Sequence, residues 1–500
     1  MDSSFPGDDK NGHSLAIQLG LRMKIVEKIV IAGWAASWYS HLRIEGRKTK
    51  KPELLVAGTF RRKSPLTRES FLFQLDEKPP LHKNLIYGLQ WVLTSIPSVV
   101  FFATLCGVAL GLDPAAQISF SQRLLILSGL MTMLQSLLGH RYPVLEGPSS
   151  AILVTFMVLA PHGGLPAIEG GMICGGLFLI LVGVFKWLKW LSSLFTPRVV
   201  GVILILVALT LLSFIYPLLI GISKASPHGE LSIFGSSLLI ILLVAFMSHR
   251  LKGFLQTTSM LAGILFGLAL FLLKGEISFA LVNQSSWFAL PSPLLGVWPS
   301  FSLPAILAIV CTYLAVMANS LGSIHGISEV VGAEGLEDRI HRGIGMNGVG
   351  GVIAGLLGVS GLVSLSISPG IVLVTRVASR YVLTMSGVIM IVCAFIPKLW
   401  AVLTAVPPSV IGSVLFVVLS SQFLVGMNVM LAKKGTIERR EYFTVGIPIL
   451  MGAMISIMPK PFFQLFPNII ASLVGNGLVM GIFFSLFLEH VLFRQRKEDR

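Results

Sequence analysis

Long apolar runs recur along most of this chain, and they restrict its fold more than any other feature. From Leu85 onward the runs are about 18–25 residues long, enough for a helix to cross about 30 Å of hydrocarbon. In lipid every backbone amide and carbonyl needs an internal partner, so such segments fold as a bundle of α-helices. The pattern predicts fourteen spans, at 85–111, 121–139, 143–160, 167–186, 198–219, 232–248, 254–273, 303–325, 343–361, 363–379, 380–397, 402–431, 442–459 and 468–492.

The composition agrees with an all-α polytopic membrane protein. The chain has 500 residues, of which 54% are hydrophobic and 12% charged, and its mean hydropathy is +0.83. About a quarter of an ordinary globular chain is charged. The net charge of +15 is typical of nucleic-acid binding, but here the basic residues lie between the apolar runs and at both ends. We therefore expect the lipid bilayer as partner and no nucleic acid.

The same basic residues predict how the spans are oriented. An even number of spans puts both termini on one side. If that side is cytoplasmic, fourteen Lys and Arg fall in the inside loops. Five fall in the outside loops, namely Arg123, Lys224, Lys274, Lys398 and Lys460. Cytoplasmic loops carry an excess of Lys and Arg, so we expect a cell-membrane protein with both termini cytoplasmic.

The chain divides into three parts. Residues 1–84 contain fifteen Lys/Arg and nine Asp/Glu, which predicts a cytosolic N-terminal extension, partly disordered, with an amphipathic helix near 15–42. The start shows no signal-peptide pattern. Residues 85–492 form the transmembrane domain, and 493–500 form a short basic cytosolic tail. Since residues 1–70 lack a broad apolar core, we expect them to be dispensable for the activity of the transmembrane domain.

Nothing in the sequence indicates an enzyme, a metal site or a cofactor. No HExxH, GxSxG or Walker pattern appears, and an enzyme needs clustered nucleophiles, bases or metal ligands. The cysteines lie inside apolar runs, without CxxC or ligand-like spacing to histidine, and are interpreted as small buried hydrophobes. They are Cys106, Cys174, Cys311 and Cys393.

Two spans are interrupted at matching positions. Span three carries Pro143, Gly147 and Pro148, and span ten reads Ser-Leu-Ser-Ile-Ser-Pro-Gly over residues 364–370. Backbone groups freed by proline and glycine persist at membrane depth only beside a cavity or inside the protein. Each break falls in the third span of a set of seven. Such matched breaks indicate a substrate site between two inverted repeats.

Four motifs extend this pattern over residues 75–492. They read Gly88-Leu89-Gln90-Trp91 after Pro79-Pro80, Pro143-Val144-Leu145-Glu146-Gly147-Pro148-Ser149-Ser150, Met317-Ala318-Asn319-Ser320-Leu321-Gly322, and Ile367-Ser368-Pro369-Gly370 up to Thr375-Arg376. In order and spacing the chain resembles the nucleobase–ascorbate transporter family.

The resemblance implies a fold and a function. The fold would be fourteen transmembrane segments as two inverted repeats of seven, divided into a core and a gate domain. Short antiparallel strands of spans three and ten would meet at the substrate, and we expect extended pieces near 147–152 and 364–369 at mid-membrane. The function would be transport of a purine or pyrimidine base of the xanthine/uracil class by alternating access. A second copy of the chain is a candidate partner.

The same resemblance supplies candidate site residues, with departures. Family members usually carry a carboxylate in span eight and often another in span ten, whereas this chain has Asn319 and Ile367 there. Ser368 replaces the signature Asn, and Ser150 replaces an aromatic residue. The candidate substrate-binding residues are Asn319, Ser323, Ser149, Ser150, Ser366, Ile367, Ser368 and Gly370.

Coupling to an ion depends on one further acid. H⁺ or Na⁺ is the candidate co-substrate, but neither Asn319 nor Ile367 titrates, so we expect weak or absent proton coupling. Glu146 is the candidate coupling residue that could substitute. Its place in the sequence predicts a position at the cytoplasmic edge, paired with Arg141. Glu169 is expected to be solvated, and His140 to lie at the membrane interface.

An anion carrier is the alternative function. Sulfate-type transporters share the inverted-repeat architecture, and a site without acids, next to helix N-termini, would suit a small anion. The regulatory C-terminal domain common in those transporters does not appear after the last span. The base carrier is the leading hypothesis.

Overall fold

The computed structural model describes residues 71–223, 226–251, 256, 258–292, 298–431, 439–463 and 465–493. The amphipathic helix expected near 15–42 and residues 494–500 of the expected basic tail lie outside these described residues.

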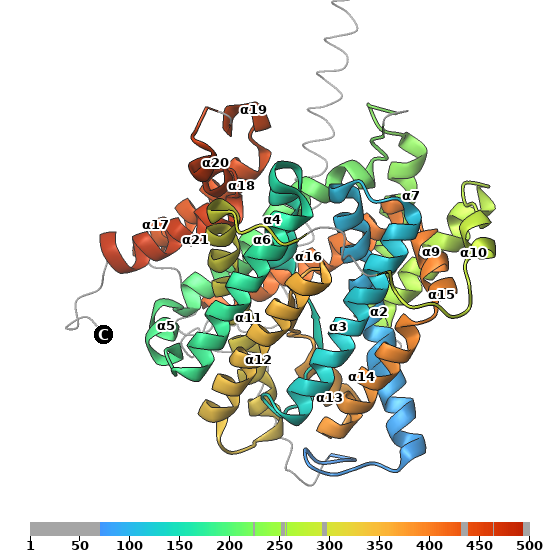
Figure 1. Ribbon diagram of the computed structural model, residues 1–500, viewed down its shortest axis with the longest axis horizontal. Helices are drawn as coiled ribbons and strands as arrows, with labels where there is room; N and C mark the ends of the chain where they lie inside the picture. Colours follow the sequence, from blue (N-terminus) through green and yellow to red (C-terminus); the bar gives the residue numbers. More distant parts are fainter. Residues whose placement is uncertain are drawn as a thin grey trace, which may run out of the picture. The chain divides into compact units, whose positions relative to one another are not determined.

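The first half of the described chain is helical apart from one short strand (Figure 1). Its elements are α2 (Leu81–Leu110), α3 (Pro114–Leu137), β1 (Glu146–Pro148), α4 (Ser150–Val184), α5 (Leu188–Leu194), α6 (Pro197–Leu219), α7 (Leu231–Arg250), α9 (Ser259–Leu273) and α10 (Ala280–Gln284).

The second half repeats this character, with one strand among helices. Its elements are α11 (Leu303–Val331), α12 (Leu336–Leu357), β2 (Leu362–Ser364), α13 (Ser368–Thr375), α14 (Arg380–Ala394), α15 (Pro397–Thr404), α16 (Pro408–Leu431), α17 (Arg439–Thr444), α18 (Gly446–Ile457), α19 (Lys460–Phe463), α20 (Asn468–Val474), α21 (Gly477–Phe487) and the π-helix η2 (Leu488–Leu492).

Several helices are built to cross a membrane. Within the described residues six are long and apolar enough, and the pair α14–α15, bent by 82°, would make a seventh. Shorter apolar helices include Ser150–Pro161 and Ser259–Leu273. Spans three and four both fall within α4, but the non-helical backbone of Gly164 (φ 63°, ψ −170°) separates them into two helices. The chain is therefore a multi-pass helical membrane protein, whereas the count of fourteen spans stays a prediction.

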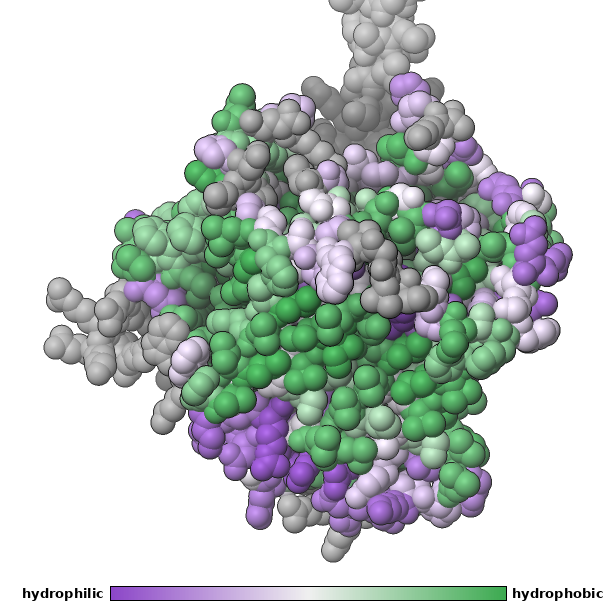
Figure 2. All heavy atoms as spheres, in the orientation of Figure 1, coloured by the Kyte–Doolittle hydropathy of each residue, from purple (hydrophilic) through white to green (hydrophobic). Residues whose placement is uncertain are grey.

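Helix α7 shows why lipid is the expected solvent. Four of its twenty residues are buried, and two of those are the serines Ser236 and Ser237. Leu242 and Phe246 are 66% and 60% exposed. A soluble helix buries its apolar side and exposes its polar side, and α7 does the reverse. Figure 2 shows a belt of hydrophobic side chains across the visible face, with polar side chains above and below it.

Glycines set the closest helix crossings. A Cβ placed on Gly129 of α3 would lie 2.6 Å from the carbonyl oxygen of Gly387 in α14. A Cβ on Gly176 of α4 would likewise lie 2.6 Å from the carbonyl oxygen of Gly348 in α12. A Cβ on Gly201 of α6 would lie 2.6 Å from the carbonyl oxygen of Gly426 in α16. Small residues let membrane helices approach until their backbones touch.

These crossings organise two groups of helices. In the first, called the core bundle, α4 packs on α11 and α12, and α14 packs on α2 and α3. Both strands belong to it. In the second, called the gate bundle, α16 packs on α6, α7 and α9, and α18 packs on α6 and α21. Figure 1 shows α3 beside α14 and α6 beside α16.

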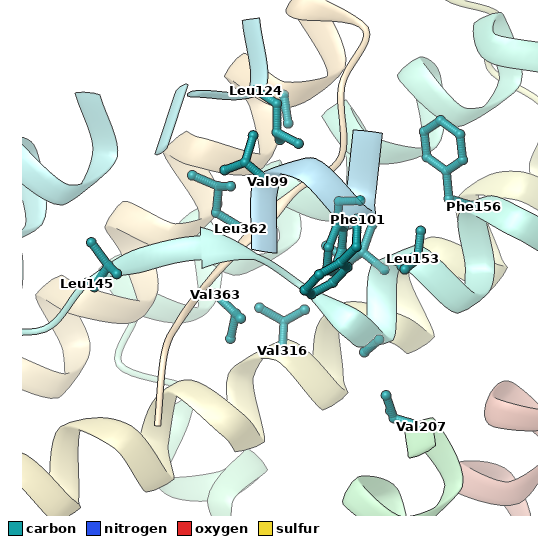
Figure 3. Packing of buried hydrophobic residues seen from close by; sticks show 14 of the residues in the cluster. Val99, Phe101, Leu124, Leu145, Leu153, Phe156, Val207, Val316, Leu362 and Val363 are labelled. Carbon is teal, nitrogen blue, oxygen red and sulfur yellow. The ribbon is translucent and has the colours of Figure 1, made fainter. Parts of the chain in front are cut away.

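The two strands form a short antiparallel pair inside the core bundle. Glu146 faces Ser364, Gly147 faces Val363, and Pro148 faces Leu362. Leu362 and Val363 point to opposite sides of the pair, toward buried residues of neighbouring helices (Figure 3). The extended backbone ends earlier than the sequence suggested at 147–152 and 364–369, because α4 begins at residue 150 and α13 at 368.

A segment before α2 is tied to the core bundle by backbone hydrogen bonds. Leu72 N donates to Arg376 O (2.8 Å), Ala378 N donates to Phe73 O (2.9 Å), and Arg380 N donates to Leu75 O (3.0 Å). Phe73 and Val377 form a parallel bridge. Packing therefore starts well before the expected domain boundary at residue 84.

This segment leads to a prediction about truncation. Deleting residues 1–70 should leave base uptake and the melting temperature unchanged, whereas deleting 1–77 should lower the melting temperature by several degrees. Each lost hydrogen bond contributes about 0.5–1.5 kcal/mol, and the longer deletion also removes the 2.7 Å ion pair between Asp76 and Arg380. Thermal unfolding of the purified proteins in detergent tests this. Equal melting temperatures for both deletions would contradict it.

Candidate functional site

A cavity of about 370 Å³ lies between the core bundle and the gate bundle. Its volume falls within the range of about 300–1,000 Å³ that is usual for small-molecule sites. The core side consists of Thr94, Ser98, Phe101, Phe102, Pro148, Ser149, Ser150, Ala151, Ala315, Val316, Asn319, Val363, Leu365, Ser366 and Ile367. The gate side consists of Ile203, Leu204, Val207, Met260, Val418, Ser421, Gln422 and Val425.

The structure brings five of the candidate residues together in this cavity. Ser149 and Ser150 arrive from the start of α4, Asn319 from the middle of α11, and Ser366 with Ile367 from the turn after β2. Their sequence positions span more than two hundred residues, and the strand pair β1–β2 brings the two breaks side by side. The matched interruptions in spans three and ten therefore converge on one cavity.

The polar centre of the core wall is Asn319. Its side-chain Oδ1 accepts a hydrogen bond from Ser366 Oγ at 2.8 Å. Ser366 Oγ also lies 2.9 Å from Ser323 Oγ. Among the described residues the Asn319 side-chain amide nitrogen has no hydrogen-bond acceptor. Asn319 can therefore offer two N–H donors to a bound molecule while its oxygen stays anchored.

The start of α4 adds backbone donors to the same wall. Ser149 is the N-cap, and its side chain accepts a hydrogen bond from Ile152 N. Ser149 N donates to Gly361 O (3.0 Å), which ties the cap to the residue before β2. The first turn of a helix leaves N–H groups without intrahelical acceptors. Ser150 and Ala151 line the cavity at this first turn, so the helix end favours a carbonyl oxygen or partial negative charge there.

Three candidate residues lie outside the lining of the cavity, and two of them, Ser323 and Ser368, hold the wall in place. Ser323 is buried and donates to Ser364 O at 2.7 Å. Ser368 is buried at the start of α13, and its Oγ accepts a hydrogen bond from Leu145 N at 3.1 Å. Gly370 is exposed, and a Cβ built on it would meet nothing within 4 Å. Their position in the structure is behind or beside the site.

The expected position of Glu146 at the cytoplasmic edge is wrong. Glu146 is the first residue of β1, and its side chain is 0% exposed. Its partners are Ser364 Oγ at 2.6 Å and His140 Nε2 at 3.4 Å, and not Arg141. The side-chain Nε of Arg141 donates instead to Leu137 O. Antiparallel pairing with β2 decides this, because the register places Glu146 opposite Ser364 inside the core bundle.

Three other expectations are also corrected by burial. Glu169 is not solvated but lies within α4 and is 5% exposed. Arg123 is not in an outside loop but lies within α3, is 6% exposed and interacts electrostatically with Glu169. His140 is not interfacial but completely buried. Charged residues inside a membrane bundle are costly and usually face a partner or a cavity.

Sequence reasoning missed the opposite wall of the cavity. Gln422 of α16 lines it, and within the described residues its side chain has no hydrogen-bond partner. Thr94 and Ser98 of α2 also line the cavity, and their hydroxyls donate to Gln90 O and Ser95 O of their own helix. The triplet Ser420-Ser421-Gln422 inside the apolar run 402–431 is a polar signal that could have identified α16.

The cavity can bind a flat, neutral, polar molecule. Within the described residues its lining holds no Lys, Arg, His, Asp or Glu. Phe101, Phe102, Val316 and Val207 supply apolar surface. Figure 3 shows Phe101 and Val316 close to the strand pair and Val207 on a separate helix. Two amide side chains and several hydroxyls supply donors and acceptors. No group of three or more potential metal ligands occurs in the described part of the chain.

Comparison with known proteins adds an independent observation. The sequence profile of the Permease family matches residues 82–461. The uric acid transporter of Escherichia coli is 27% identical over 84% of this chain and 89% of its own length. The uric acid permease of Bacillus subtilis is 27% identical over 83% of this chain and 94% of its own length.

A solved structure is similar in fold. The murine Solute Carrier 26 family member A9 anion transporter, in its inward-facing state, superposes with a TM-score of 0.57. The match covers 92% of this chain and 76% of that chain, at 11% sequence identity. This likeness concerns the arrangement of the helices and not the ligand.

Proposed function

Because this chain belongs to the Permease family, the nucleobase–ascorbate transporters that its motifs resemble, we propose that it carries a purine or pyrimidine base across the cytoplasmic membrane. The protein is a transporter and not an enzyme. Relatives named for uric acid and xanthine favour an oxidised purine as the first substrate to test.

The observation that carries the proposal is the pair of amide side chains on opposite walls of one cavity. Asn319 of the core bundle keeps two free N–H donors, and Gln422 of the gate bundle keeps both a donor and an acceptor. A nucleobase is a flat ring with carbonyl and N–H groups along its edge. Asn319 donates to a base carbonyl, Gln422 binds the opposite edge, and Phe101 and Phe102 cover the ring face.

Alternating access follows from the position of the cavity between two bundles. In our proposal fourteen segments form two inverted repeats, both termini are cytoplasmic, and the gate bundle moves against the core bundle around the bound base. Separation of the bundles would remove Gln422 from the base while Asn319 retains it. Two copies of the chain would assemble through the outer face of the gate bundle, where α7 exposes leucines.

An anion is a weaker substrate candidate. The similar fold of an anion transporter supports it, and the N-terminus of α4 could bind a negative group. An anion of full charge needs a matching cation, however, because desolvating an unpaired charge costs several kcal/mol or more. The described lining of the cavity contains no Lys or Arg. A neutral base has no such requirement.

Counterflow in proteoliposomes tests the substrate. Vesicles loaded with unlabelled compound should accumulate trace label from outside when the compound is uric acid, xanthine or uracil, and not when it is sulfate or bicarbonate. Counterflow needs no ion gradient, so it reports substrate recognition alone. Exchange of sulfate or bicarbonate with none of the bases would overturn the proposed function and favour the anion carrier.

A further inference from the structure

A buried acid and a buried histidine lie together behind the cavity. Glu146 and His140 are both 0% exposed, and His140 Nε2 lies 3.4 Å from Glu146 Oε1. Glu146 Oε1 also accepts a hydrogen bond from Ser364 Oγ at 2.6 Å. The second carboxylate oxygen, Oε2, is buried and has no hydrogen-bond partner among the residues that the structure describes. A buried carboxylate with an unsatisfied oxygen is costly unless a proton or another donor reaches that oxygen.

The histidine is held in one tautomer. Tyr142 N donates to His140 Nδ1 at 3.0 Å, so Nδ1 is an acceptor and carries no hydrogen. A neutral imidazole then has its hydrogen on Nε2, which faces Glu146. If Nδ1 carried a hydrogen, its N–H would face the backbone N–H of Tyr142, and neither group could accept a hydrogen bond from the other. The imidazole therefore presents a donor to Glu146 Oε1, and Oε2 is the atom of the pair at which the geometry leaves room for a further hydrogen.

A continuous set of contacts joins this acid to the cavity. Ser364 donates from its side chain to Glu146, and its backbone carbonyl accepts from Ser323 Oγ at 2.7 Å. Ser323 Oγ contacts Ser366 Oγ at 2.9 Å, and Ser366 donates to Asn319 at 2.8 Å. The side chain of Ser364 contacts the acid, and its backbone carbonyl contacts the serines that lead to Asn319. A shift of β2 therefore moves the hydrogen-bond partners of Glu146 and of Asn319 together.

The surroundings of the pair are polar and almost free of charge. From α3, Thr132 Oγ1 accepts from Glu146 N (3.1 Å), and Gln135 Oε1 accepts from His140 N (3.3 Å). From α12, which packs on His140 at Gly343, Arg339 donates to the carbonyl oxygens of His140 and Arg141.

The other ionisable groups of the packed elements point elsewhere. His82, Lys83 and Tyr87 lie in the first two turns of α2. Arg123 interacts with Glu169, and Arg380 of α14 donates to Ser136 O and pairs with Asp76. His341 interacts with Glu337, Asp338 and Lys186, Arg342 is exposed on α12, and His325 and Glu329 are exposed on α11. Arg141 donates to Leu137 O.

We propose that Glu146, held by His140 and Ser364, is the proton-binding site that couples base transport to the proton gradient. The inference rests on the proposed function and places the coupling acid on β1 instead of α11. One proton binds the carboxylate from the outside, making the pair neutral, and leaves to the cytosol after the base. Base binding shifts Asn319 together with Ser366, which stays hydrogen-bonded to its oxygen, and the serine contacts pass that shift to Ser364 and the acid.

Glu146→Gln tests the proposal in proteoliposomes. The amide keeps the shape of the acid, accepts from Ser364 and His140 through its oxygen, and cannot bind a proton. Accumulation of base driven by an inward proton gradient should fall at least about tenfold, whereas counterflow without a gradient should stay within about twofold of wild type. Retained counterflow also shows that the variant is folded and inserted.

Matched controls separate this role from a general effect of core substitution. Glu329→Gln changes an exposed acid of α11 in the core bundle and should leave both accumulation and counterflow unchanged. Ser364→Ala removes the 2.6 Å donor and should reduce gradient-driven accumulation. Ser360→Ala should not, because the hydroxyl of this buried serine makes one weak hydrogen bond within the described chain, to Gly361 O at 3.4 Å. The Ser364→Ala comparison remains informative if Glu146→Gln does not insert.

The outcomes are distinct. Accumulation that collapses only in Glu146→Gln and Ser364→Ala, with counterflow retained, supports the proposal. Gradient-driven accumulation that is equal in wild type and Glu146→Gln overturns it, as does wild-type uptake that ignores the proton gradient. Absence of wild-type counterflow with every base overturns the proposed function, and with it the coupling that rests on it.

Discussion

Replacing Asn319 with leucine should reduce base uptake by about 5-fold to 140-fold while the protein still folds. The two side chains have similar size, but leucine offers no hydrogen bond. The base carbonyl to which Asn319 would donate is then left buried and unpaired, which costs about 1–3 kcal/mol. At about 1.4 kcal/mol per factor of ten, that range predicts the loss. Initial rates of counterflow measure it.

The control for this variant is Asn283→Leu, the same substitution at an exposed position in α10. It should leave counterflow unchanged. Gln422→Leu should weaken counterflow too, because it removes the second amide from the gate wall. Wild-type rates in Asn319→Leu, with base affinity unchanged, would show that the cavity between the bundles is not the binding site.

Replacing Gly129 with valine should abolish recovery of folded protein. A Cβ at this position would lie 2.6 Å from Gly387 O, a backbone atom that no side-chain rotation can move. The helices α3 and α14 would have to separate, and this crossing supports the core bundle on the side of β1. Overpacking a well-packed core costs about 1–3 kcal/mol and occasionally more, and valine adds three carbons against backbone that cannot yield. Size-exclusion chromatography of the detergent extract should show aggregate instead of a single peak.

A graded pair of variants checks the physical reason. Gly129→Ala should lower the melting temperature, whereas Gly322→Ala should not, because a Cβ on Gly322 meets nothing within 4 Å. Alanine also favours helix by up to about 1 kcal/mol over glycine, so Gly322→Ala can be slightly stabilising. Equal melting temperatures for the two alanine variants would show that the close crossing of α3 and α14 does not limit stability.

Local patterns in the sequence determined the class of protein and the location of the breaks. An apolar run identifies a helix without information from other segments, because each helix in lipid satisfies the hydrogen-bonding groups of its own backbone. The runs therefore located helices such as α6, expected at 198–219 and found at Pro197–Leu219. Proline and glycine act on their own segments in the same way. Ser149, Ser150, Ser366 and Ile367 could be named as cavity residues because they flank those breaks.

The gate wall could not be derived in this way. Gln422 reaches the cavity because α16 packs on α6 and α9, and no local pattern specifies which helix faces which. The sequence patterns did not distinguish Ser323, Ser368 and Gly370 from Ser366 and Ile367, so all five were expected in the site. The strand register and the turn after β2 decide instead that Ser366 faces the cavity and that Ser323 supports it from behind.

Glu146 marks the division between the two kinds of information. The sequence by itself determined that an acid stands at the break in span three, next to Gly147 and Pro148. Only the tertiary structure decided its environment, because its closest donor, Ser364, is 218 residues away in the chain. The state of a buried carboxylate depends on desolvation and on donors within a few ångströms. Neither is a property of the neighbouring sequence. Glu146, which the sequence places at the cytoplasmic edge beside Arg141, therefore becomes a buried group linked to the cavity once β1 pairs with β2.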